Sequence, residues 1–264
     1  MTLLSEQLAD SPLAAWPMDE TSGTIMYDAS GNGRDGEYVG GVTLGAAGIA
    51  AAGVRSVSFP GVVSAYAKVA YDSAWMDPAT EFTIEAMVQA TSLTPVTYSG
   101  IFGQYASAGF TGMAALGIYT DATLYAEAWG VGGSQPSNTD QPVVSPITSP
   151  YLFTFRRSAS TLRVFKDGVV FASDAADGVP GYFAHDFVIG LMASDGAFPW
   201  NGRISHVAYY DTALSDARIA IHAGAAATTY INLAPSPGGV LTAATAPRTR
   251  VKLGLTSSID GGPP

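Results

Sequence analysis

The chain has 264 residues, of which 47% are hydrophobic and 13% charged, enough apolar material to form one large all-β domain or two small domains. Its 12 basic and 22 acidic residues give a formal net charge of −10. That charge repels phosphate backbones and anionic lipid surfaces, so we expect neither a nucleic acid nor a membrane partner. Cysteine is absent, which excludes disulfides and thiolate metal sites.

The first ten residues do not have the pattern of a secretory signal peptide. They have no basic region, and Glu6 stands where the apolar core of a signal peptide would continue. The longest weakly polar run, Gly40 to Val54, is 15 residues long and contains five glycines. It is too short and too flexible to span a bilayer.

The segment that follows is rich in turns and acidic residues, in two runs from Trp16 to Gly23 and from Asp28 to Gly36. Gly31 to Gly36 fits the letters G-x-G-x-x-G, but no helix follows, so we reject dinucleotide binding. The spacing from Asp28 also resembles the start of an EF-hand loop. Its twelfth position is Val39 instead of a glutamate, so it is not an EF-hand.

Most of the remaining chain alternates between apolar and polar residues, which predicts strands. Residues 82–88 predict a half-buried strand with Glu85 on its solvated face, and further strands are expected at 151–157, 187–191 and 203–210. Lys166-Asp167-Gly168 predicts a hairpin turn between residues 162–165 and 169–171, because Asp-Gly accepts positive φ. One convincing helix is expected, from Ser215 as N-cap to His222. Short strands separated by turns of this kind are typical of a sandwich.

Several of these segments resemble the laminin-G-like, concanavalin A-like jelly-roll domains. The resemblance rests on the opening segment, on the strand ends Val57-Ser58-Phe59-Pro60-Gly61 and Val164-Phe165-Lys166-Asp167-Gly168-Val169, on Phe82 to Val88, and on the closing run from Asn201 to Ser215. It implies an all-β, concanavalin A-like jelly-roll β-sandwich over residues 1–227. The chain departs from the family pattern where Ser205-His206 replaces an acidic pair and Met87 replaces a tryptophan.

Residues 228–264 are rich in Pro, Gly, Thr and Ala and predict an extended C-terminal arm. Arg248, Arg250 and Lys252 against Asp260 give the arm a charge of +2, which leaves −12 on residues 1–227. A basic arm suits docking on an acidic surface of another protein or of a second copy, so these three cations are the predicted partner-binding residues. A solvated, disordered tail is the alternative.

The resemblance to calcium-binding members of the family implies a Ca²⁺ site formed by Asp19, Glu20, Asp28 and Asn32 with turn carbonyls. The alternative is that these Asp and Asn side chains only stabilise turns through their own backbone hydrogen bonds.

The sequence lacks the residue patterns that common hydrolase mechanisms require, so we expect no catalytic activity. The E-x-D-x-E pattern of related glycosidases is absent, and Glu81 and Glu85 are about 13 Å apart along one strand, too far for a retaining pair. The three histidines show no zinc spacing, and no G-x-S-x-G motif occurs.

Aromatic residues in loops are the remaining candidates for a binding site, because sugar rings stack on aromatic faces. The candidates are Trp75, Tyr105, Trp129 and Trp200. For any single tryptophan among them, a core or interface position is the alternative.

The function hypothesis that follows is a non-catalytic structural protein on the surface of a bacteriophage virion, either a head decoration or a minor tail protein. Leu8 to Trp16 resembles the opening of leaderless domains in phage structural proteins. On this hypothesis the partners are other virion proteins, further copies of the chain and cell-surface glycans. The alternative is a free carbohydrate-binding lectin module or a fragment of a secreted polysaccharide-active enzyme, and a glycoside hydrolase ranks third.

Overall fold

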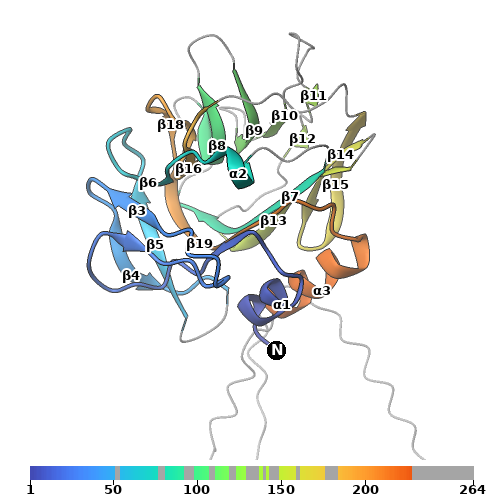
Figure 1. Ribbon diagram of the computed structural model, residues 1–264, viewed down its shortest axis with the longest axis horizontal. Helices are drawn as coiled ribbons and strands as arrows, with labels where there is room; N and C mark the ends of the chain where they lie inside the picture. The colour runs from blue at the N-terminus through green and yellow to red at the C-terminus, as the bar shows by residue number, and fades with distance from the viewer. Residues whose placement is uncertain are drawn as a thin grey trace, which may run out of the picture. The chain divides into compact units, whose positions relative to one another are not determined.

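The computed structural model describes residues 1–50, 54–76, 81–91, 98–106, 111–118, 123–128, 137–138, 141–142, 149–158, 161–175 and 184–227. All of them fall within one compact unit, Met1–Thr229. Strands dominate, and they form two large antiparallel sheets (Figure 1), so the prediction of an all-β sandwich is confirmed. The predicted arm, with Arg248, Arg250 and Lys252, lies outside the described residues.

The first sheet has the strand order β15-β14-β13-β7-β19-β5-β4, with β1 paired to β19. Its strands are β1 (Ala14–Trp16), β4 (Thr43–Ala47), β5 (Arg55–Pro60), β7 (Phe82–Ala90), β13 (Tyr151–Ser158), β14 (Thr161–Lys166), β15 (Val169–Ala175) and β19 (Asn201–Tyr210). The predicted hairpin joins β14 to β15, with Asp167 at φ 51° and Gly168 at φ 77°. Both central residues of this turn therefore adopt the positive φ that a tight hairpin needs.

The second sheet has the order β11-β10-β9-β8-β16-β6-β3-β2, with β12 paired to β10. Its strands are β2 (Ile25–Met26), β3 (Gly36–Val39), β6 (Tyr66–Val69), β8 (Ser99–Ala106), β9 (Thr111–Ile118), β10 (Thr123–Ala128), β11 (Ser137–Asn138), β12 (Gln141–Pro142) and β16 (Phe187–Ile189). A separate two-stranded ribbon, β17 (Leu191–Ala193) and β18 (Ala197–Pro199), follows β16 directly.

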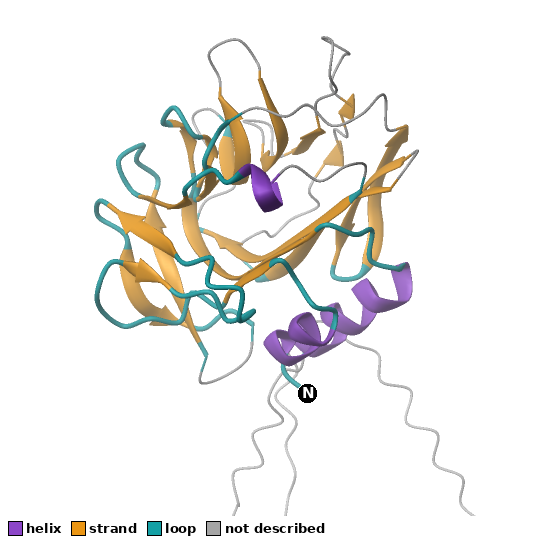
Figure 2. Cartoon of the chain, in the orientation of Figure 1, coloured by secondary structure: helices purple, strands orange, loops and turns teal. Residues whose placement is uncertain are grey.

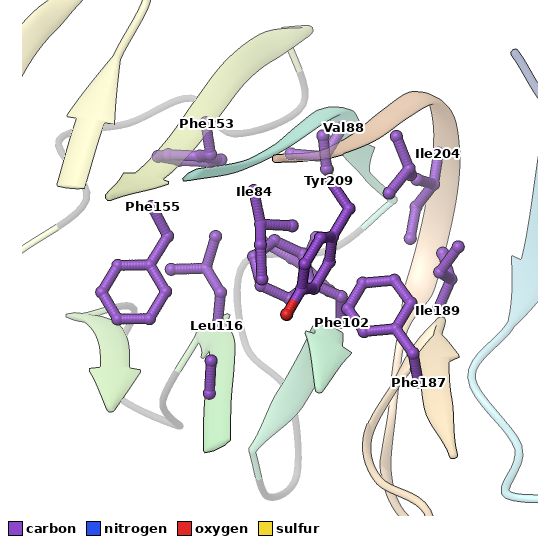
Figure 3. Packing of buried hydrophobic residues seen from close by; sticks show 14 of the residues in the cluster. Ile84, Val88, Phe102, Leu116, Phe153, Phe155, Phe187, Ile189, Ile204 and Tyr209 are labelled. Carbon is purple, nitrogen blue, oxygen red and sulfur yellow. The ribbon is translucent and has the colours of Figure 1, made fainter. Parts of the chain in front are cut away.

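The main core fills the space between the two sheets (Figure 3). In β7, for example, alternate side chains from Phe82 to Val88 point into it, as the period-two pattern of the sequence requires. Its members include Ile84, Val88, Phe102, Leu116, Phe153, Phe155, Phe187, Ile189, Ile204 and Tyr209, all of which are buried. Edge-to-face and stacked ring contacts, such as Phe187 against Tyr209 at 5.7 Å, fix how the aromatic side chains interdigitate.

In the described part of the chain, three helices accompany the sheets: α1 (Leu3–Ala9), α2 (Ser73–Met76) and α3 (Asp216–Ala226). The predicted helix is confirmed as α3, and the Ser215 hydroxyl caps it by accepting a hydrogen bond from the amide of Arg218 at 3.2 Å. The sequence interpretation missed α1, which a reciprocal capping box between Thr2 and Ser5 begins. Helices α1 and α3 pack together on the outer face of the first sheet (Figure 2).

This helical cover corrects the prediction that residues 82–88 form a half-buried strand. Strand β7 is buried on both faces, and Glu85, expected in solvent, is fully buried. One Glu85 oxygen lies 2.9 Å from Nδ1 of His222, and the other accepts a hydrogen bond from the Thr154 hydroxyl at 3.0 Å. His222 Nε2 lies 3.0 Å from an oxygen of Asp10, and Arg218 also donates to Asp10.

These contacts explain how buried charges are tolerated beneath the helices. Burial alone lowers the pKa of His222, but the hydrogen bond to Glu85 and the negative charges of Glu85 and Asp10 outweigh it and raise that pKa overall. A paired cation and carboxylate avoid the cost of an isolated buried charge. The network therefore holds both terminal helices against the sheet and makes Glu85 a structural residue.

Candidate functional site

Asp28 organises the opening acidic segment through its own hydrogen bonds. Its Oδ1 accepts from the backbone amides of Ala15 and Ser30, both at 2.9 Å. Its Oδ2 accepts from the Ser30 hydroxyl at 2.7 Å and from the Arg34 amide at 3.0 Å. Burial raises the pKa of Asp28, but these hydrogen bonds lower it more, so the net pKa lies below its usual value. Both oxygens of the carboxylate are thus already committed to protein donors.

Of the other three predicted calcium ligands, two form hydrogen bonds within the protein and the third is exposed. Glu20 accepts from the Tyr27 amide at 2.9 Å and from the Tyr38 hydroxyl at 2.5 Å. Asn32 turns its amide nitrogen toward two backbone carbonyls just ahead of β1, and Asp19 is exposed. Within the part of the chain that the structure describes, no group of three or more His, Asp or Glu residues is arranged to hold a metal ion. The four residues therefore do not fit a calcium site, and the turn-stabilising alternative describes them better.

The aromatic residues predicted to offer open rings are mostly buried. The exposed fraction is 7% for Trp75, 4% for Tyr105 and 1% for Trp200. Trp75 lies in α2, where its ring centroid is 5.6 Å from that of Tyr209, and it closes one end of the core. The expectation that these three rings project from loops is wrong, because each packs against a sheet. Trp129 lies outside the described residues.

The outer face of β8 and β9 forms a second candidate surface. On this face, glycines occupy positions where other strands have side chains. At Gly100 and at Gly103 a Cβ would overlap the backbone of Met192 in β17, and at Gly117 it would press on the Met192 side chain. Strand β17 therefore lies directly on β8, with no side chain between their backbones. The chain makes this fold-back at Gly190, whose φ is 80°.

The ribbon brings together three aromatic rings that are far apart in sequence. Tyr98 just before β8, Tyr125 in β10 and Phe198 in β18 are each partly exposed, and we call them the aromatic cluster. The ring centroid of Tyr98 lies 5.6 Å from that of Tyr125 and 4.8 Å from that of Phe198, both edge-on. Phe198 has φ 63°, an uncommon backbone for a bulky residue.

Polar groups border the aromatic cluster, and they carry negative charge. Glu127 lies on the same face of β10 as Tyr125, and Asp195 is exposed in the turn between β17 and β18. We call these two carboxylates the acidic rim. Burial, followed by the charges of Glu127 and Asp195, raises the pKa of the neighbouring Tyr105 to about 12. Ser194 ties this side of the ribbon to β8, since its hydroxyl donates to the Tyr105 carbonyl at 2.9 Å.

Among the described residues predicted for sugar binding, Tyr105 is the one that borders this surface. The sequence interpretation missed the aromatic cluster because each ring, considered alone, is an ordinary strand or turn residue. The detectable signal was the outer-face pattern of β8 and β9, where small residues recur at Gly100, Gly103, Ala115 and Gly117.

Family comparison agrees with this architecture. Residues 61–220 match the Laminin_G_3 model, described as the concanavalin A-like lectin/glucanases superfamily. The chain belongs to this family. No curated protein sequence matches this chain.

Solved structures with a similar fold include toxin binding domains. The binding domain of Paraclostridial Mosquitocidal Protein 1 is 12% identical with a TM-score of 0.65, over 82% of this chain and 52% of that one. The ligand binding domain of botulinum neurotoxin serotype D, in complex with N-acetylneuraminic acid, is 10% identical with a TM-score of 0.64, over 83% and 52%.

A Trypanosoma rangeli sialidase in complex with sialic acid is 16% identical with a TM-score of 0.58, over 80% of this chain and 32% of the enzyme. The chain thus spans about half the length of the toxin chains and about a third of the sialidase. At these identities the likeness concerns the fold.

The role of Asp28 is testable by replacing it with asparagine. Asp28→Asn turns an NH₂ group toward backbone donors, so we expect a loss of about 2 kcal/mol in the free energy of unfolding, measured by urea denaturation. Asp35→Asn is the matched control, because exposed Asp35 accepts one backbone hydrogen bond that an amide oxygen also accepts. Excess chelator should leave the wild-type melting temperature unchanged, and a chelator-induced drop would contradict the turn-stabilising role of Asp28.

Proposed function

We propose that this chain is a non-catalytic, lectin-like adhesive module that binds glycans at the aromatic cluster. The observation that carries the proposal is the convergence of three partly exposed rings, Tyr98, Tyr125 and Phe198, with hydrogen-bonding groups at their border. The C–H face of a pyranose stacks on aromatic rings, and its hydroxyls need acceptors and donors at the ring edges. Exposed Asp195, in the turn between β17 and β18, carries such a group beside the cluster.

The surroundings of Glu85 support a non-catalytic role. Glu81 and Glu85 are the acids that come nearest to a catalytic pair in the sequence. Glu85 is sealed beneath α1 and α3 and paired with His222, so it is out of reach of a polysaccharide. The toxin neighbours are, by their titles, binding domains. Release of sugar products from a polysaccharide panel by the purified protein would contradict a purely binding role.

The place of the module is a further part of the proposal: we place it on the surface of a bacteriophage particle, as a head decoration or minor tail protein. Support comes from the segment Leu8 to Trp16, which resembles a segment of phage structural domains, and from the basic arm predicted beyond residue 227. Attachment through Arg248, Arg250 and Lys252 to other virion proteins or to further copies would leave the sandwich free to face glycans.

Electron microscopy of native particles that carry a tag on this chain tests the placement. Label on the capsid or the tail is the expected result. A tagged chain that is absent from every particle, yet binds glycans, would favour the alternative of a free lectin module or a piece of a secreted polysaccharide-active protein. This alternative is supported by the fact that the chain matches only 52% of the mosquitocidal toxin chain and 32% of the sialidase chain.

Glycan binding is tested by removing one ring of the aromatic cluster. Tyr125→Ala should weaken binding of the best ligand on a glycan array at least tenfold, about 1.4 kcal/mol, because a stacking face is lost. Tyr125→Phe keeps the face and should retain most of the affinity. The matched control is Tyr27→Ala, which removes an exposed tyrosine beside β2, at the opposite end of the second sheet. Equal binding by all three variants would rule out the aromatic cluster as the binding site.

A further inference from the structure

The buried side chain of His222 in α3 connects three elements of the domain. Its Nδ1 lies 2.9 Å from a carboxylate oxygen of Glu85 in β7. Its Nε2 lies 3.1 Å from the backbone carbonyl oxygen of Glu6 in α1, and 3.0 Å from a carboxylate oxygen of Asp10, the C-cap of that helix. One imidazole ring thus joins α3 to the first sheet through one nitrogen and to α1 through the other.

Both ring nitrogens of His222 face hydrogen-bond acceptors. An ionised carboxylate and a backbone carbonyl have no proton to donate. The imidazolium carries an N–H at each nitrogen, so it can donate to Glu85 and to α1 at the same time. A neutral imidazole carries one N–H, and its other nitrogen then turns a lone pair toward an acceptor. The geometry therefore fits the protonated ring, whichever tautomer the neutral ring adopts.

Four elements contribute charged or titratable groups that face this ring. Two carboxylates lie directly against it, and a third is bound at 3.1 Å by a guanidinium, whose Nη2 is 3.4 Å from Nε2 of His222. A tyrosine ring lies 6.4 Å away, measured between ring centroids. Together with His222 we call these groups the His222 network: Glu85 of β7, Glu6 and Asp10 of α1 and its C-cap, Arg218 of α3 and Tyr210 of β19.

The electrostatics of the His222 network favour the same protonation state. Burial lowers the pKa of His222, and the positive charge of Arg218 lowers it further. The hydrogen bond to Glu85 and the negative charges of Glu85 and Asp10 raise this pKa, and they outweigh the other two effects.

Helices α1 and α3 depend on their contacts with the rest of the domain. They have 7 and 11 residues, and isolated helices shorter than about 12–15 residues are marginal in water. Besides the His222 network, apolar side chains hold them in place: Leu3, Leu4 and Leu8 from α1, and Ile219, Ala223 and Ala226 from α3. The main core between the two sheets contains no member of the His222 network. Loss of the network therefore weakens the helices and leaves the packing between the sheets in place.

We propose that His222 is a pH-sensitive switch, which holds α1 and α3 on the first sheet while it is protonated and lets both helices open when the pH rises. The proton leaves to the solvent. The ring then turns a lone pair either toward the carboxylate of Glu85 or toward the acceptors of α1, and one of its two connections is lost. Opening of the helices gives the ring and the buried carboxylates access to water, which relieves the cost of an unpaired buried charge.

Proton linkage gives the direction and the slope of the response. The pKa of His222 is raised while the helices are closed, and it returns to about 6.5 when the ring is hydrated. The helices are therefore held at full strength below about pH 6.5, and this stabilisation is lost as the pH rises through the raised pKa. Between these two values the equilibrium constant for opening should increase about tenfold per pH unit, because opening releases one proton.

Amide hydrogen exchange on the full chain, from about pH 6 to about pH 9, tests the switch. Protection factors are used because they correct for the pH dependence of intrinsic exchange. The amides of α1 and α3 should be less protected than those of β7 and β19 at every pH, because the helices open without unfolding of the sandwich. Their protection should fall about tenfold per pH unit above about pH 6.5. NMR titration of the His222 ring in the same protein should give a midpoint above about 6.5.

Two pairs of variants assign the response to the His222 network. His222→Gln removes the titrating ring, so the protection of α1 and α3 should lose this pH dependence. His185→Gln is the matched control, since it removes a histidine just before β16 in the second sheet and should keep the wild-type slope. Asp10→Asn removes a negative charge beside Nε2 and should lower the NMR midpoint of His222. Asp216→Asn, whose side chain pairs with an arginine of β13, should leave that midpoint unchanged.

Four results would overturn the inference. A His222 midpoint at or below about 6.5 would show that the closed state does not favour the proton. Equal protection of the helices and of β7 and β19 would show that the helices open only with global unfolding. A wild-type slope in His222→Gln would assign the response to another group. An unchanged midpoint in Asp10→Asn, which also serves if His222→Gln does not fold, would remove α1 from the switch. None of these results depends on glycan binding.

Discussion

The contact of β17 with the outer face of β8 is the constraint on which the proposed site depends. Backbone can lie on backbone there because Gly100 and Gly103 have no side chain, and a Cβ at either position would overlap Met192. The fold-back at Gly190 is also backbone-controlled, since its φ of 80° suits glycine. The ribbon that results brings Phe198 to Tyr98 and Asp195 to the neighbourhood of Tyr105. Without the ribbon, the sheet would present Tyr98 and Tyr125 with no third ring beside them.

On the outer face of the first sheet, buried charges are paired. Beneath α1 and α3, the buried carboxylate of Glu85 is matched by His222, and Asp10 is matched by Arg218, so opposite charges meet at hydrogen-bond distance. Charge pairing on this face accounts for how the helices are held.

Local sequence patterns predicted strands β7, β13 and β19, the hairpin at Asp167-Gly168 and the Ser215 cap, because these depend on residues close together in the chain. The strand predicted over residues 187–191 is instead divided into β16 and β17 by the fold-back at Gly190. Patterns failed where a distant element decides the environment. Glu85 alternates like a solvent-facing residue, and only the helices from the two ends of the domain bury it.

The same reason explains the outcome for the candidate site. Trp75 and Trp200 occur in turn-like sequence, yet tertiary packing buries their rings. Tyr98, Tyr125 and Phe198 come from three segments, and their proximity follows from the strand order and the glycine contacts, which no local spacing reveals. The turn role of Asp28 was one of two alternatives in the sequence, and its four hydrogen bonds favour that alternative.

The location of the sugar on the protein is the central claim, and mapping by NMR tests it most directly. A ¹⁵N- and ring-¹³C-labelled protein is titrated with the tightest-binding glycan from the array, and the shifts of every assigned resonance are followed. The largest changes should fall on the rings of Tyr98, Tyr125 and Phe198 and on the amides of β10 and of the β17–β18 turn. Changes concentrated instead on the segment around Asp28, or on α1 and α3, would place the sugar elsewhere and contradict the site.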